Sequence, residues 1–165
     1  MIAALNRFIS RSADRCRLFY LLINKWKEFE WSEDYNVAFQ QLKEYLSCPP
    51  IMSSLAADEV LYAYIAVALH AVSLVLIRYD NSLQKLVYYV SKLLHKAEVR
   101  YLPLEKAILA VVHAMRKLPH YFQAHTVVVL TQLPLKSVLQ IVDYTGRISL
   151  WNTNLGAFDT CLRPL

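Results

Sequence analysis

The sequence predicts an α/β (α+β) fold in which a helical N-terminal arm precedes three antiparallel strands, a crossover helix and a parallel fourth strand. Two features carry this prediction. Between residues 104 and 122, apolar side chains recur at steps of three and four, which places them on one helix face: Leu104, Ile108, Val111, Met115, Leu118 and Phe122. The β-branched run HTVVVLT (residues 125–131) then predicts a short strand buried on both faces.

The first fifty residues are predicted to form the helical arm. Residues 2–9 are typical of a short helix, Ser12 is placed to cap a second one, and residues 18–26 continue as an apolar helical segment. The run WSED (residues 31–34) is a helix start, because Ser is a good N-cap and the helix dipole favours acids in the first turn. Two prolines directly after Cys48 end this helix.

The sheet is predicted from the segments that follow the loop at residues 50–58. Residues 59–67, 71–78 and 83–90 read as strands, and the run DNS (residues 80–82) as a turn between the last two. Short turns make these strands an antiparallel meander. After the crossover helix, the fourth strand can join in parallel.

Beyond the fourth strand the sequence predicts short helices at residues 134–141 and 146–155, and a truncated strand from residue 158. The chain then divides into three parts. These are the arm (1–50), the mixed α/β domain (51–142) and a C-terminal extension toward a missing domain (143–165).

Composition and charge narrow the function. The chain is 56% hydrophobic, which is ample for a core, and its two glycines are isolated, so it has no Gly-rich phosphate loop. The net charge of +5 is uneven: residues 1–27 hold six bases and one acid, whereas residues 28–165 hold twelve of each. A basic arm suits a polyanion such as nucleic acid, and an ordinary solvated surface is the alternative.

The three cysteines are widely spaced and form no CxxC pair, and the five histidines offer no tight ligand pair. We therefore expect reduced thiols, no metal site and an intracellular location, in the cytoplasm or nucleus. The start of the sequence shows no evident signal peptide.

One apolar run allows a different interpretation. Residues 60–77 contain no charge and are long enough for a membrane-spanning helix, which would make this a membrane-anchored protein. Two adjacent strands with a turn near Leu69 and His70 are the alternative. Tyr62 and Tyr64 favour the strands, because aromatic hydroxyls are awkward in mid-bilayer. A membrane is therefore not an expected partner.

The order of these elements is that of the ribonuclease H fold, and the sequence also resembles a family. It is similar to the pol polyprotein of gypsy-type LTR retrotransposons in four motifs that occur in the same order: residues 31–46 followed by the prolines, YYVSK (88–92), YLPLEK (101–106) and HYF (120–122). The matching part is the RNase H-like domain that follows the reverse transcriptase fingers and palm. Residues 5–16 resemble the end of the polymerase thumb, and residues 146–160 the segment that leads toward the active RNase H.

The resemblance also places the family's metal ligands. Active members hold two Mg²⁺ ions with clustered carboxylates, because Mg²⁺ prefers hard oxygen ligands. The matching positions here are Ala66, Ala107 and Gln132, and none is acidic. Glu105 is about 200° away around the helix from position 107. The resemblance therefore implies a connection-like domain with no catalytic residue, no metal and no cofactor, which joins polymerase to nuclease.

The expected partners are an RNA–DNA or DNA duplex, held through its phosphates, and the rest of the pol polyprotein. No small molecule is expected. The candidate phosphate contacts are basic residues of the arm and of the connector before the crossover helix: Arg7, Arg11, Arg15, Lys92, Lys96 and Arg100. The alternative function is an active metal-dependent ribonuclease H whose acids come from elsewhere, such as Glu105 or Asp80.

Overall fold

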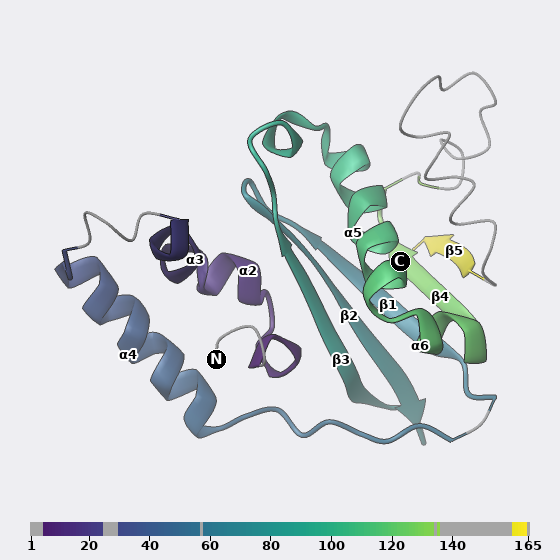
Figure 1. Ribbon diagram of the computed structural model, residues 1–165. Helices are drawn as coiled ribbons and strands as arrows, with labels where there is room; N and C mark the ends of the chain where they lie inside the picture. The colour runs from purple at the N-terminus through teal and green to yellow at the C-terminus, as the bar shows by residue number, and fades with distance from the viewer. Residues whose placement is uncertain (1–4, 25–29, 57, 134, 136–159, 165) are drawn as a thin grey trace.

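The computed structural model describes residues 5–24, 30–56, 58–133, 135 and 160–164. Within these residues, strands form one mixed sheet in the order β3-β2-β1-β4-β5 (Figure 1). Their bounds are β1 (Leu61–Val67), β2 (Ala71–Asp80), β3 (Leu83–Leu93), β4 (Val127–Thr131) and β5 (Thr160–Pro164). The first three are antiparallel neighbours, and β4 runs parallel to β1. The predicted mixed fold is confirmed, and the strand predicted near the C-terminus is β5, which extends the sheet beside β4.

The predicted turn between the second and third strands is also confirmed. Asn81 and Ser82 both have positive φ angles, 49° and 67°. Two successive residues of this kind are the signature of the tight hairpin turn that matches the twist of its strands. The turn fixes the register in which β2 pairs with β3.

The crossover helix covers one face of the sheet, and it is shorter than predicted. Helix α5 (Pro103–Lys117) ends directly before Leu118, and α6 (Pro119–Ala124) begins directly after Leu118. Pro119 explains the break, because proline lacks a backbone N–H and clashes with the preceding turn. Leu118 and Phe122 are nevertheless buried with α5 in the main core, so the predicted apolar face is correct although the helix is not continuous.

The arm covers part of the opposite face. It contains η1 (Asn6–Phe8), α2 (Ser12–Arg15), α3 (Arg17–Asn24) and α4 (Glu33–Ser47). Figure 1 shows α2 beside the sheet and α4 lying farther out. The Ala13 N–H donates to Ser91 Oγ of β3 at 2.9 Å in a buried contact. A second core of Ile9, Cys16 and Phe19 joins the first part of the arm to α4.

Two expectations about the arm have different outcomes. The helix start at WSED is confirmed, since α4 begins at Glu33 with both acids in its first turn. The expectation that Ser12 caps α2 is wrong. The N-cap is Arg11, whose left-handed backbone (φ 51°) starts the helix, and Ser12 is its buried first residue, with no hydrogen-bond partner for its hydroxyl.

The long apolar run forms two paired strands and not a spanning helix. Residues 61–67 and 71–77 lie in β1 and β2, joined by a short turn at Leu69 and His70. None of the helices in the described residues has the length and apolar content needed to cross a bilayer. Of the helices predicted near the C-terminus, the one at 146–155 lies outside the described residues, and of the other only Leu135 is described, buried in the main core.

Candidate nucleic-acid interface

The three candidate arginines of the arm, Arg7, Arg11 and Arg15, are all exposed, but they do not form a straight stripe. The chain is extended at Ile9 and left-handed at Arg11, so the helix does not run from Arg7 to Arg15. The Arg7 guanidinium lies 4.6 Å from the Phe8 ring centre, and Arg11 Nη2 pairs with Asp14 Oδ2 at 2.6 Å. Exposed contacts of this kind contribute little, so the Arg7 and Arg11 side chains remain available to another anion.

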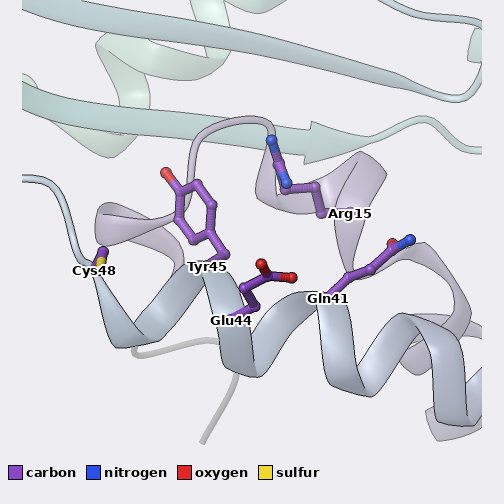
Figure 2. Close-up of a pocket in the computed structure, with 5 residues that line it drawn as sticks. All are labelled: Arg15, Gln41, Glu44, Tyr45 and Cys48. Atoms are coloured by element: carbon purple, nitrogen blue, oxygen red, sulfur yellow. The ribbon is translucent and has the colours of Figure 1, made fainter.

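Arg15 differs from the other two because it lies beside α4. Figure 2 shows its side chain across a cleft of about 530 Å³ from Tyr45 and Glu44. Its guanidinium lies 4.7 Å from the Tyr45 ring centre. The Tyr45 hydroxyl accepts the Ser10 N–H at 3.1 Å, so this tyrosine connects α4 to the loop before α2. Because its guanidinium already packs over this ring in the cleft beside α4, Arg15 is less available to phosphate than Arg7.

The end of β3 and the connector to α5 bring together one ion pair and two exposed cations, and Lys92, predicted in the connector, lies in β3 because the strand runs to Leu93. Lys92 Nζ pairs with Glu98 Oε2, and both side chains are 17% exposed. The same oxygen accepts the His95 N–H at 2.8 Å. Burial raises the pKa of Glu98, but the hydrogen bonds from Lys92 and His95 outweigh it, so the net pKa is lowered. Lys92 is thus neutralised by its partner, whereas Lys96 and Arg100 are exposed.

His113 is expected to make the stability of the fold depend on pH. Burial, followed by the charges of Lys117 and Lys92, lowers its pKa from 6.5 to about 4, while Glu98 opposes and Arg116 adds to the shift. Between about pH 4 and pH 6.5 the His113 imidazole is therefore protonated in the unfolded chain and neutral in the folded chain. We expect stability to fall as the pH drops from about 6.5 to about 4.

The full shift corresponds to about 3 kcal/mol, and because the ring is only half-buried we expect on the order of 1–2 kcal/mol. Urea unfolding of the wild type and of His113→Gln across this pH window measures it. The difference between the two proteins should change with pH. A constant difference contradicts the assignment to His113, since other groups titrate equally in both.

The three positions matched to the family's metal ligands lie in different surroundings. Ala66 is exposed on β1, where it pairs with Ser73 on the sheet face opposite α5. Ala107 is fully buried in the core between α5 and the sheet. Gln132 is exposed and follows β4, and because Tyr64 pairs with Leu130 in parallel strands, Ala66 and Gln132 lie toward the same end of the sheet.

The acids named as alternatives have other partners. Glu105 Oε2 accepts the Leu102 N–H at 2.9 Å, which confirms its place in the first turn of α5. Asp80 lies 3.6 Å from the guanidinium of Arg78. Within the described parts of the chain, no group of three or more His, Cys, Asp or Glu side chains is arranged to hold a metal ion.

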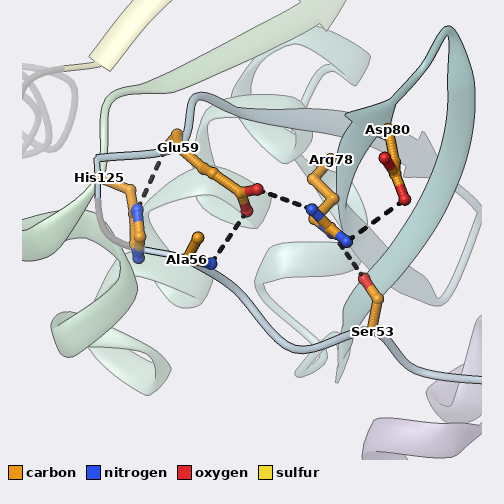
Figure 3. A network of polar contacts seen from close by, with 6 residues as sticks. All are labelled: Ser53, Ala56, Glu59, Arg78, Asp80 and His125. Carbon is orange, nitrogen blue, oxygen red and sulfur yellow. Dashed lines mark hydrogen bonds and ion pairs between the residues drawn. The ribbon is translucent and has the colours of Figure 1, made fainter.

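The sequence analysis did not predict a polar network centred on Arg78, which lies at the end of the sheet opposite Ala66 and Gln132 (Figure 3). Its guanidinium donates to Glu59 Oε1 at 2.6 Å and to Ser53 Oγ at 3.1 Å. The other oxygen of Glu59 accepts the Ala56 N–H at 3.2 Å, and the Glu59 carbonyl lies 3.1 Å from His125 Nδ1. The signal was a single arginine at the end of the apolar run AVSLVLI, since a charge so placed needs a partner.

Two comparisons with known proteins match this geometry. The family model of the RNase H-like domain found in reverse transcriptase matches residues 31–129, from just before α4 into β4. Among curated protein sequences, none matches the chain. The fold is similar to the foamy viral protease–reverse transcriptase in complex with double-stranded DNA, with TM-score 0.79 and 15% identity over 99% of this chain and 36% of that chain.

The same viral protein in complex with an RNA/DNA hybrid gives a TM-score of 0.80 at 14% identity, over 99% of this chain and 23% of that chain. The native protease–reverse transcriptase of prototype foamy virus gives 0.61 at 20% identity, over 96% and 22%. At such identities the likeness shows the fold alone. The chain spans between about a fifth and just over a third of the length of these proteins.

Proposed function

This chain belongs to the family of RNase H-like domains found in reverse transcriptases, and we propose that it is a non-catalytic member that contacts a nucleic-acid duplex through phosphates. The observation that carries the non-catalytic part is the chemistry at positions 66, 107 and 132. Two methyl groups and one amide do not fit Mg²⁺, which requires several hard, charged oxygens. No hydrolytic step is therefore assigned to this chain.

The proposed contacts are the exposed cations of the arm and connector. Arg7 and Arg11 are the strongest candidates on the arm, and Lys96 and Arg100 on the connector, because none of the four has a buried ion-pair partner among the described residues. Lys92 is a weaker candidate because its ion pair with Glu98 is largely buried, and Arg15 because its guanidinium packs over the Tyr45 ring in the cleft beside α4. Relatives of the same fold carry double-stranded DNA or an RNA/DNA hybrid, which supports a duplex as the ligand.

The chain is much shorter than these relatives, which supports a role inside a larger polyprotein. We propose that residues 1–50 form the end of a polymerase thumb, that residues 51–142 are the connecting domain, and that residues 143–165 lead to a nuclease domain. A gypsy-type retroelement is the proposed origin, with the cytoplasm or nucleus as its location.

Duplex binding is tested by titrating a fluorescent RNA–DNA hybrid at several salt concentrations. We expect log affinity to fall linearly with log salt, with a slope of about −0.9 per phosphate contact. Replacing Arg7, Lys96 and Arg100 with Ala together should weaken binding about tenfold at low salt and reduce the slope by roughly two to three. Arg17→Ala is the control, since it changes the arm's charge at a half-buried position. Equal losses in the two proteins would refute the assigned contacts.

The non-catalytic proposal is tested by incubating the hybrid with Mg²⁺ or Mn²⁺ and following cleavage. We expect no cleavage above the buffer control. Cleavage that requires the metal and disappears in Glu105→Gln or Asp80→Asn overturns the proposal in favour of an active ribonuclease H.

A further inference from the structure

On the sheet face opposite α5, a row with two large side chains lies next to a row of small ones. Tyr64 on β1 and Tyr89 on β3 lie on either side of Val75, which pairs with both. In the next row, Ala66 pairs with Ser73. Because neighbouring strands are about 4.8 Å apart, the two tyrosines stand roughly 10 Å apart across β2. Val75 stands between the two tyrosines, and the small Ala66 and Ser73 of the next row leave a depression beside them.

This depression is a cavity of about 140 Å³, and the loop that enters α2 closes one side of it with Ser10 and Arg11. Most of its lining is carbon. The volume is close to that of a cavity of about 150 Å³ known to admit one benzene ring. The cavity therefore matches a single six-membered ring better than a fused pair.

Two polar groups accompany the apolar walls. Ser73 lies on the floor, with its hydroxyl 3.0 Å from Ser91 Oγ, and a hydroxyl has capacity for a further hydrogen bond. Arg11 lies on the rim, and its ion pair with Asp14 is solvent-exposed. Exposed ion pairs of this kind are weak, so a phosphate can compete for the guanidinium.

We propose that this pocket binds an unpaired pyrimidine nucleotide of a single strand, with the ring in the depression that Tyr64 and Tyr89 line and the phosphate at Arg11. Aromatic side chains hold unpaired bases by stacking, and a nearby cation holds the backbone. The base of a paired nucleotide is stacked inside its duplex and cannot enter. The site is thus distinct from the proposed duplex contacts, although both use Arg11.

Ala66 has a direct part in this site. Its methyl group forms part of the apolar lining at the position that the family resemblance assigns to an acidic ligand. A carboxylate there would repel a phosphate held at Arg11 and place charge against the ring. The residue that removes metal chemistry from this position is therefore one that makes the pocket suitable for a base.

The proposal is tested with three labelled strands of equal length: oligodeoxythymidine, oligodeoxyadenosine and an abasic strand with the same phosphates. Fluorescence anisotropy should show thymidine binding about tenfold tighter than the abasic strand, because stacking of one base contributes about one such factor. Adenosine should bind closer to the abasic strand. Equal affinity for thymidine and abasic strands overturns the proposal.

Variants separate this site from the duplex contacts. Ala66→Phe fills the pocket at an exposed position and should remove the preference for thymidine, while Leu83→Phe adds the same ring to an exposed position outside it and should not. Asp14→Asn frees Arg11 and should tighten the binding of all three strands about two- to threefold. Duplex binding should survive Ala66→Phe. An unchanged melting temperature shows that the variant is folded, and a thymidine preference that survives Ala66→Phe in that folded protein overturns the proposed nucleotide site. Loss of duplex binding alone bears only on the proposed function.

Discussion

Ala107→Glu is expected to destabilise the folded chain by about 3 kcal/mol or more, a large effect for a single substitution. Ala107 is fully buried in the core between α5 and the sheet. A glutamate there buries a carboxylate among apolar side chains without a partner of opposite charge. Burial should raise its pKa, so the loss relative to wild type should be smaller near pH 4 than at pH 7.

Ala66→Asp is the matched control, since it also places an acid at a position that the family resemblance assigns to a ligand. Ala66 is exposed, so this change should shift the free energy of unfolding by less than about 0.5 kcal/mol. Urea unfolding at both pH values compares the two proteins.

A triple variant with acids at 66, 107 and 132 extends the test. Addition of Mg²⁺ should not restore its stability, because the three side chains start from different surroundings. Stabilisation by Mg²⁺ that the wild type does not show would mean that a metal pocket is still formed, since a ligand stabilises the state that binds it.

The sequence was most informative where one side-chain period holds over several turns. The steps of three and four in α5 and the β-branched run of β4 give the correct elements, because burial of one face decides both. The same period hid the break at Pro119. Helix α6 resumes with Phe122 facing the core, so the apolar pattern continues across a helix end that only the proline marks.

The site was less predictable because it depends on contacts that spacing does not encode. The partner of Lys92 is Glu98, six residues away in a connector without helical spacing, so its neutralisation was not visible. The proposed pocket depends on Tyr64 and Tyr89 falling in one row across β2. A shift of one residue in register would move these side chains to the other face, and the sequence alone does not fix that register.

Arg78→Met is expected to destabilise the protein by about 2 kcal/mol, because it leaves the half-buried Glu59 carboxylate without its cation. The network in Figure 3 joins the loop before β1 to the end of β2, and through the Glu59 carbonyl to His125 just before β4. It therefore holds in place β1, which carries Ala66, and β4, which Gln132 follows. Arg116→Met is the control, since Arg116 is exposed and its loss should change stability by less than about 0.5 kcal/mol.

A double-mutant cycle separates the ion pair from the loss of packing. Glu59→Gln alone should cost about 1 kcal/mol, and the combination of both changes should cost less than their sum by about 1 kcal/mol. Strict additivity would mean that the guanidinium acts through Ser53 and Asp80 and not through Glu59. Because the Arg78 network lies at the opposite end of β1 from Ala66, Arg78→Met should leave the thymidine preference of the folded protein intact. That result would show that the Arg78 network stabilises the sheet and does not contact the nucleic acid.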